Sequence, residues 1–236
     1  TGHTGAVAIN QVVSTTAAAA GTGGTFSSNG TTFSNTAAVT TDGGQITLTH
    51  SGVATIGAAL NASVAAGAGA GGVDIDADGG IALGSNVLAS GQLVRLRDAI
   101  TVTGDSQIST GAGAGNVQLD SSLDDDGVGG TTSNVTLTGG TGTVTITGVT
   151  GATNALTTLS ATGDDISLGD IGDAGNGGVT GTTTLTATDD INFTGTLYRT
   201  DGQQLFTAGP ATHNVTGGAT TFRTSGDLIS FTGGRI

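Results

Sequence analysis

The chain has 236 residues and a formal net charge of −13 at pH 7, with 45 glycines, one proline and no cysteine, methionine or tryptophan. All acidic side chains are Asp and all basic ones are Arg, so strong helix formers are scarce and a helical fold is disfavoured. The charge disfavours nucleic acid as a partner, the lack of a long apolar run predicts no membrane insertion, and the absence of a three-residue glycine period excludes collagen.

Residues 1–43 differ in character from the rest and are expected to form an N-terminal strand followed by a linker or capping arm. An apolar segment at 6–13 precedes a stretch rich in Ala, Gly, Thr and Ser that contains Phe26 and Phe33. Such a strand could pair with a neighbouring molecule, because strand addition draws its affinity from main-chain hydrogen bonds. The candidate assembly residues are Ala6, Val7, Ala8, Ile9, Val12 and Val13.

Residues 44–236 are predicted to form a body of β-repeats. Short segments alternate Val, Ile, Leu or Phe with polar residues, and Gly-rich turns separate them, which is the period-two pattern of half-buried strands. The predicted strands span residues 45–49, 72–76, 80–83, 93–97, 100–103, 116–119, 134–138, 142–147, 165–168, 190–193 and 228–231.

The strands recur at intervals of roughly 20 residues, which favours a parallel β-helix, also called a β-solenoid. Ile81 and Ile100 are 19 residues apart, and Ile166 and Ile191 are 25 apart. Segments 161–169, 187–195 and 224–233 are similar to one another, and the 38 residues from Ile191 to Ile229 are interpreted as two steps of 19. One or two β-sandwich domains are the alternative, because turns every 8–12 residues also describe sandwiches; the few aromatic residues argue against them.

The phrase Gly-Asn-Val-Gln-Leu-Asp at 115–120 and the Asp-Asp-Ile copies at 164–166 and 189–191 resemble large bacterial surface exoproteins. The resemblance is to the β-helical repeat regions of filamentous-haemagglutinin-like and autotransporter-like adhesins. It implies a secreted, elongated, non-enzymatic stalk or adhesive surface. No functional residue of that family maps onto this chain.

The candidate metal ligands are Asp74, Asp76 and Asp78, followed by Gly79. Alternate Asp residues before a Gly form the first half of a calcium loop, and Ca²⁺ is the only cofactor that the sequence suggests. The twelfth position is Ser85 and not the usual Glu. The competing interpretation is a strand whose Asp side chains face solvent while Val, Ile and Ala face inward.

The remaining motifs receive structural interpretations. Asp124 to Asp126 are expected in a solvated loop, and the pairs Asp164–Asp165 and Asp189–Asp190 are expected to be turn residues and not paired catalytic carboxylates. Thr-x-Thr segments at 136–138 and 143–147 raise the hypothesis of ice binding, although Thr is also the commonest outward strand residue here.

The sequence therefore predicts a self-assembling structural segment of an extracellular surface fibre, stalk or coat, with no enzymatic activity. Its expected partners are copies of itself or further repeats of the same chain, together with host or matrix glycans. The alternative is an adhesin or carbohydrate-binding module, for which Tyr198 is the one aromatic side chain with a polar tip. A polysaccharide-acting β-helix enzyme is a distant third.

Overall fold

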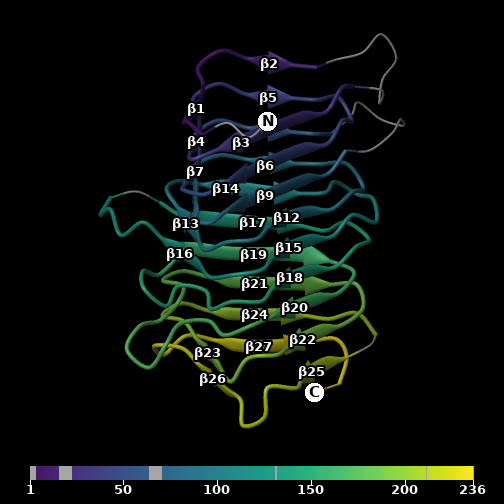
Figure 1. Cartoon of the computed structure of the whole chain (residues 1–236). Helices are drawn as coiled ribbons and strands as arrows, with labels where there is room; N and C mark the ends of the chain where they lie inside the picture. The colour runs from purple at the N-terminus through teal and green to yellow at the C-terminus, as the bar shows by residue number, and fades with distance from the viewer. Residues whose placement is uncertain (1–3, 16–22, 64–70, 131, 211, 236) are drawn as a thin grey trace.

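The computed structural model describes residues 4–15, 23–63, 71–130, 132–210 and 212–235, and within these ranges the protein is all-β with no helix. The chain winds through about nine turns of a solenoid, and strands pair with those of the turns before and after (Figure 1). Every strand pairing is parallel. The predicted β-helix is confirmed, and the β-sandwich alternative is wrong because sandwiches are built from antiparallel sheets.

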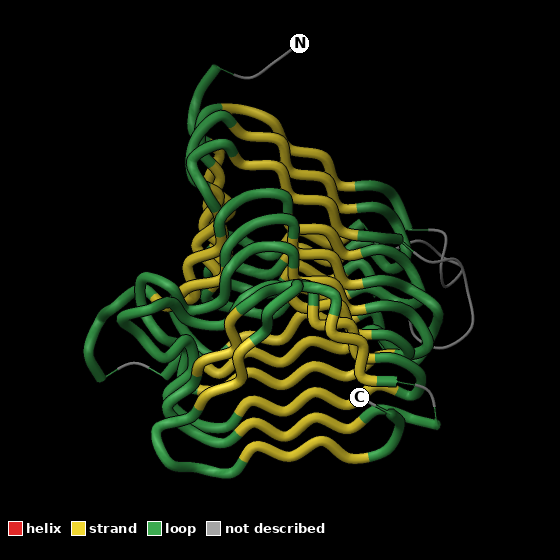
Figure 2. Tube along the Cα trace, turned by 90° about the horizontal axis from the view of Figure 1, so that it is seen from below, coloured by secondary structure: helices red, strands yellow, loops and turns green. Residues whose placement is uncertain are grey.

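Three parallel sheets form the sides of the solenoid, and Figure 2 shows their strands stacked from turn to turn. Sheet A contains β1 (Val7–Ile9), β4 (Phe33–Asn35), β7 (Ala54–Ile56), β10 (Ile81–Leu83), β13 (Ile100–Val102) and β16 (Leu123–Asp125). Sheet B contains β2 (Val13–Ser14), β5 (Val39–Thr40), β8 (Leu60–Asn61), β11 (Val87–Leu88), β14 (Ser106–Ser109), β17 (Asn134–Thr138), β19 (Thr158–Gly163), β21 (Thr183–Ala187), β24 (Gln204–Thr207) and β27 (Ile229–Thr232). Sheet C contains β3 (Phe26–Gly30), β6 (Ile46–His50), β9 (Val73–Ala77), β12 (Val94–Leu96), β15 (Val117–Leu119), β18 (Val144–Ile146), β20 (Ile166–Leu168), β22 (Ile191–Phe193) and β25 (His213–Val215). A fourth sheet pairs β23 (Leu197–Arg199) with β26 (Thr221–Arg223).

The side of the solenoid occupied by sheet A narrows after β16, because its strands are reduced there to single bridging residues. Single-residue bridges continue the ladder from Leu123 to Thr150, from Thr150 to Ile171 and from Ile171 to Tyr198, after which β23 and β26 widen it again. On this side, two successive turns therefore pair through a single residue each, Thr150 and Ile171. The residues after these two form loops instead of longer strands.

Alternation of apolar and polar residues places one side of each strand in the core. In β9, Val73, Ile75 and Ala77 are buried, whereas Asp74 and Asp76 are partly exposed. Because the pairing is in register, equivalent core residues stack about 4.8 Å apart from turn to turn. Along sheet C one column is Val73, Val94, Val117, Val144, Ile166 and Ile191, and the other is Ile75, Leu96, Leu119, Ile146, Leu168 and Phe193.

Aromatic side chains replace the aliphatic columns in the last turns. The ring of Phe193 lies 4.9 Å from that of Tyr198, 5.0 Å from those of Phe206 and Phe222, and 6.0 Å from that of Phe231, measured between centroids. These rings meet Phe193 mainly edge to face, an arrangement that adds to the area they bury. The C-terminal part of the core is therefore organised around Phe193.

The predicted repeat is confirmed in two of its steps and wrong in the third. Ile81 pairs with Ile100, and Ile166 pairs with Ile191. Ile229, however, lies in sheet B and pairs with Gln204, whereas Ile191 lies in sheet C. The segment 224–233 repeats the sequence of the two earlier copies on a different side of the solenoid, because the same alternating pattern suits any of its strands.

The N-terminal segment belongs to the same three sheets in its described parts. The apolar stretch 6–13 forms two strands, β1 and β2, and not one, with the exposed Val12 between them. These strands pair with β4 and β5 of their own chain, and β3, β4 and β5 pair in turn with β6, β7 and β8. No helix in the described part of the chain has the length and apolar character needed to cross a membrane.

Candidate functional site

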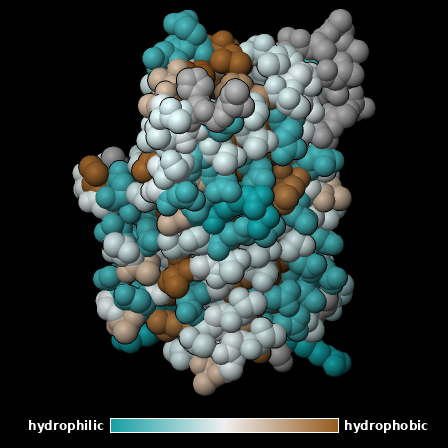
Figure 3. Space-filling model, in the orientation of Figure 1, coloured by the Kyte–Doolittle hydropathy of each residue, from teal (hydrophilic) through white to brown (hydrophobic). Residues whose placement is uncertain are grey.

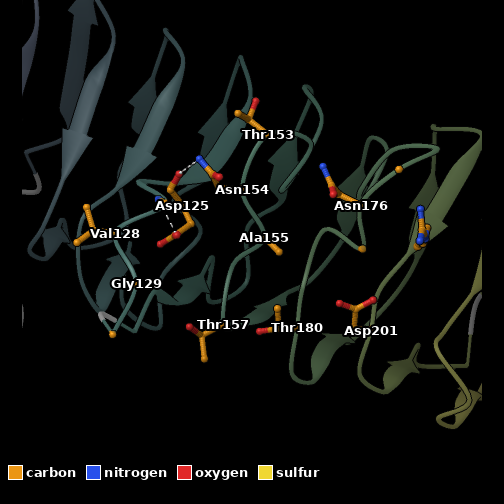
Figure 4. A pocket seen from close by; sticks show the side chains of 15 residues that line it. Asp125, Val128, Gly129, Thr153, Asn154, Ala155, Thr157, Asn176, Thr180 and Asp201 are labelled. Atoms are coloured by element: carbon orange, nitrogen blue, oxygen red, sulfur yellow. Dashed lines mark hydrogen bonds between the residues drawn. The ribbon is translucent and has the colours of Figure 1, made fainter.

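Three successive loops project from the corner that follows the narrowed side of sheet A. In their described parts they span residues 126–130 and 132–133, 151–157, and 172–182, and each leads into a strand of sheet B. Only the bridging residues Thr150 and Ile171 hold the preceding ladder in the last two of these turns. The loops are rich in Gly, Asn and Asp, which favour turns, and they lie beside one another along the solenoid (Figure 4).

A groove of about 500 Å³ lies between these loops and the chain at 199–201 (Figure 4). Glycines at 127, 129, 130, 175 and 177 leave its walls open. Its polar lining consists of Asp125, Thr153, Asn154, Thr157, Asn176, Thr180, Arg199 and Asp201. The groove therefore presents hydroxyl, amide, carboxylate and guanidinium groups contributed by several turns.

Hydrogen bonds between turns hold the amide groups of the groove in place. Asn154 Nδ2 donates to the backbone oxygen of Asp125 at 3.2 Å, and the Asp125 N–H donates to the backbone oxygen of Asn154 at 3.1 Å. Asn176 Nδ2 donates to the backbone oxygen of Ala152 at 3.3 Å. The Gly127 N–H donates to Asp125 Oδ2 at 2.8 Å. The lining is ordered before any ligand arrives, which lowers the entropy cost of binding.

The charged groups of the groove are also positioned by the protein. Arg199 Nη1 donates to the backbone oxygens of Asp173 and Ala174, at 3.1 and 2.8 Å. Asp201 Oδ1 accepts from Ser225 Oγ at 3.0 Å. One guanidinium among two carboxylates gives a lining suited to an uncharged ligand with many hydroxyls, because carboxylates accept from hydroxyls while amides and guanidinium donate to them.

Sequence reasoning did not identify this groove. The second and third loops lie in intervals without a predicted strand, at 148–164 and 169–189. The intervals at 50–71 and 194–227 are longer still, so this spacing alone does not single out the groove.

The three candidate calcium ligands share the outward face of β9 and the turn after it. Asp74 and Asp76 are partly exposed and Asp78 is exposed, in agreement with the strand interpretation. Asp74 is engaged by Arg97, whose Nε and Nη2 donate to its two carboxylate oxygens at 2.8 and 2.7 Å. Within the described ranges, no group of three or more His, Cys, Asp or Glu side chains is placed to hold a metal ion.

Calcium binding at this triad stays a prediction, and we expect weak binding or none because the loop is incomplete. Calorimetric titration of calcium into the wild type and into Asp76→Ala is expected to give the same small heats. Tight binding that disappears in the variant would contradict this expectation.

Arg95 in β12 and Arg97 directly after it are both partly exposed and contact different carboxylates. Arg95 Nε lies 2.6 Å from Asp120 Oδ2, and Gln118 Nε2 donates to the other oxygen of Asp120 at 2.8 Å. The bond to Asp74 is the main cause that raises the pKa of Arg97. Together with Asp74, these residues form a polar network on the outer face of sheet C.

The run Asp124 to Asp126 does not form one cluster. Asp124 and Asp125 lie in β16 and not in a loop, and Asp124 Oδ1 accepts from the N–H of Thr153 at 2.9 Å. Asp126 Oδ1 accepts from the N–H of Val128 at 2.8 Å. The three carboxylates accept from different backbone donors: Asp125 and Asp126 hold the first loop of the groove, and Asp124 holds the second.

The pairs Asp164–Asp165 and Asp189–Asp190 stack on successive turns, directly before β20 and β22. Asp164 Oδ1 accepts from Thr188 Oγ1 at 2.5 Å, and Asp165 Oδ1 accepts from the N–H of Asp190 at 3.2 Å. These contacts join one turn to the next, as expected for turn residues.

The two members of the second pair differ in electrostatic environment. Desolvation and the neighbouring charges of Asp190, Asp165 and Asp164 raise the pKa of Asp189. The pKa of Asp190 is lowered because Thr212 donates to its Oδ1 from the hydroxyl, at 2.8 Å, and from the N–H, at 2.7 Å. Ionisation of Asp190 thus stabilises the fold, and ionisation of Asp189 opposes it.

We expect Asp190→Asn and Asp189→Asn to have opposite effects at pH 7. Asp190→Asn should lower the free energy of unfolding by about 1 kcal/mol, the difference between charged and neutral hydrogen bonds, whereas Asp189→Asn should raise the melting temperature. The stabilisation from Asp190 exists above the ordinary Asp pKa of 3.8 and is lost as the pH falls through the lowered value. Thermal melts from pH 7 to pH 2 should therefore show the Asp190→Asn difference vanishing in acid; a difference that persists there would contradict the assignment.

Tyr198, the aromatic side chain considered as a contact for a ligand, is not on the surface. Tyr198 is fully buried, and its hydroxyl donates to the backbone oxygen of Leu168 and accepts from the N–H of Gly195, both at 2.8 Å. Burial raises the pKa of this phenol. Tyr198 is a core residue, so its interpretation as an exposed contact is wrong. His50 and His213 are buried as well, and His3 lies outside the described residues.

The comparisons with known proteins do not assign this chain to a family. The chain matches no family model, no curated protein and no solved structure. What is established is the architecture, a β-solenoid compatible with β-helical repeat proteins.

Proposed function

We propose that the chain is a non-catalytic structural segment of an extracellular microbial surface fibre, stalk or coat, joined end to end with further solenoid turns. The observation that carries this proposal is that both ends of the described solenoid have strands with an unpaired edge and core-facing apolar residues that are only partly covered. Unpaired strand edges above an apolar cross-section favour pairing with another chain or with further repeats.

The C-terminal end exposes apolar side chains that would be core in the middle of the solenoid. Val215 is 38% exposed, whereas its partner on the preceding turn, Phe193, is fully buried. Phe222, Ile229 and Phe231 are only partly covered. The strands at this end, β25, β26 and β27, each pair on one side only in the described chain.

The N-terminal end has the same character. Val7, Ile9, Val13 and Phe26 point toward the core but remain partly exposed. Val7, Ile9 and Phe26 line a hollow of about 260 Å³ at this end. Here β1, β2 and β3 are the edge strands of sheets A, B and C.

The two ends are suited to each other. Each presents one edge strand on each side of the solenoid, and β26 belongs to the side that the single-residue bridges connect to sheet A. If the N-terminal end of a second solenoid is placed against the C-terminal end of the first, all three ladders could therefore continue and both apolar cross-sections would be covered. Ala6, Ala8 and Val12 are exposed and face outward, so they would flank such a contact and not lie inside it.

Sedimentation velocity over a range of concentrations tests the proposal, with electron microscopy of the same samples. We expect concentration-dependent linear oligomers of the wild type and their loss in Val215→Asp, which places a charge in the apolar cross-section at the C-terminal end. Leu93→Asp is the matched control, because Leu93 is 41% exposed on the side of the solenoid and not at its end. Wild-type protein that stays monomeric, or equal losses in both variants, would contradict end-to-end assembly.

Deletion of residues 1–14 separates two modes of assembly. If the first strands leave their own body to complete a neighbour's sheets, the truncated protein should no longer form these oligomers. If whole ends stack, removal of β1 and β2 exposes β4 and β5, and assembly should continue.

A second candidate function, glycan binding, is favoured by the polar groove. Its lining suits a neutral oligosaccharide, and host or matrix glycans are the corresponding partners. Gly129→Leu tests this role, because Gly129 lines the groove and an added Cβ there meets no atom within 4 Å. A neutral glycan array should show binding by the wild type and by Gly129→Ala but not by Gly129→Leu; equal binding by all three would contradict a site in the groove.

A further inference from the structure

The outer face of sheet B carries one unbroken column of threonines over its last five strands, beside a second column of hydroxyl side chains that Leu205 interrupts. These strands, β17, β19, β21, β24 and β27, lie one below another in Figure 1. One column is formed by Thr138, Thr162, Thr186, Thr207 and Thr232, which are direct partners from strand to strand. The parallel column two residues earlier is Thr136, Ser160, Thr184, Leu205 and Ser230.

Backbone pairing fixes the spacing of this array in two directions. Neighbouring strands of a sheet are about 4.8 Å apart, and alternate residues of one strand are about 6.7 Å apart. Both repeats are near the oxygen spacings of the hexagonal ice lattice. The array is held by continuous ladders on a packed core, so its side chains keep their positions better than threonines of a loop would.

The threonine hydroxyls of the uninterrupted column are not used by the protein. In the described structure, Thr138, Thr162, Thr186 and Thr207 make no side-chain hydrogen bond within the chain, and Thr232 has only a 3.5 Å contact with Ser230. Threonines elsewhere are used differently. Those at 188 and 212, for example, join successive turns through their hydroxyls. The column thus offers its donors and acceptors to solvent.

Charged residues are excluded from this face although the chain carries 18 Asp and 5 Arg. None of the outward positions of the five strands is charged. On sheet C, by contrast, Asp74, Asp76 and Arg95 occupy outward positions. Figure 3, which views sheet B from outside, shows the lower half of this face mainly in the white of intermediate hydropathy.

We propose that this threonine face orders water and adsorbs to ice. Each threonine presents a hydroxyl, which hydrogen-bonds to water, beside a methyl group that disfavours mobile hydration. A regular, rigid and uncharged array of such pairs matches a solid water surface, whereas strongly hydrated ions would hold their own shells. The inference is independent of end-to-end assembly, because the face lies on the side of the solenoid.

Ice-affinity partitioning of the fluorescently labelled protein, together with an ice-recrystallisation assay, tests the proposal. We expect the wild type to enter the ice fraction and to inhibit recrystallisation. Thr162→Lys and Thr186→Lys place a long charged side chain in the middle of the column and should abolish both effects. Thr145→Lys is the matched control, since Thr145 faces outward from β18 on sheet C.

Circular dichroism melts establish that the variants are folded, because all three sites face outward. Loss of ice affinity in Thr162→Lys and Thr186→Lys with retention in Thr145→Lys would support the assignment. Exclusion of the wild type from ice, or equal behaviour of all variants, would overturn it.

Discussion

Replacement of Phe193 by Ala is expected to lower the free energy of unfolding by about 3–5 kcal/mol, the usual cost of deleting a buried aromatic ring. Phe193 is fully buried, and its ring contacts those of Tyr198, Phe206, Phe222 and Phe231. Because the surrounding rings belong to four strands that backbone ladders hold in place, they cannot close the cavity. Chemical denaturation of the wild type and the variant measures the difference.

A second measurement shows which strands the substitution of Phe193 destabilises. Each turn of a solenoid contacts mainly its neighbours, so stability is distributed along the axis. Hydrogen exchange in Phe193→Ala should accelerate in β20 to β27 and change least in β6 to β12. Phe193→Leu, which matches the aliphatic column above it, should lose much less stability. Equal losses in the two variants would mean that the aromatic cluster has no special role.

The strands of sheet C except β3 and β25 could be predicted, because they carry two large core residues around one polar residue. Segments such as β12 and β22 show this pattern without ambiguity. In sheet B, by contrast, β5, β8 and β11 are two residues long with one buried residue each, and β21 buries Thr183 beside Leu185. Strands this short have no readable period, and turn-to-turn pairing defines them.

The groove and the threonine columns could not be derived from the sequence for a related reason. Both depend on which residues of successive turns become neighbours, and the turns differ in length. The column from Thr138 to Thr232 advances by 24, 24, 21 and 25 residues, so no fixed period reveals it. The Thr-x-Thr segment at 143–147, which looks similar in sequence, lies in and around β18 on sheet C. The hypothesis of ice binding, drawn from the sequence alone, could not say which threonines share a face, because that depends on the register between turns.

Gly142→Ala is expected to be strongly destabilising although it adds a single methyl group. A Cβ at Gly142 would lie 2.3 Å from the backbone oxygen of Gly115 on the preceding turn. Gly142 also donates its N–H to Gly139 O at 2.7 Å, and its carbonyl accepts from the N–H of Asp164 at 2.9 Å. The residue is therefore held against both adjacent turns and cannot move away.

Because the opposing atom is backbone, relief requires the two turns to separate, and we expect a loss of about 3 kcal/mol, the upper part of the range for overpacked sites. Gly129→Ala is the matched control, since a Cβ there meets nothing within 4 Å. It should be neutral or slightly stabilising, because alanine restricts the unfolded chain. Denaturation midpoints of the two variants measure the contrast. A Gly142→Ala protein as stable as the Gly129→Ala protein would show that the turns can separate at this corner without cost, and that close stacking of the backbone is not what limits the residue type there.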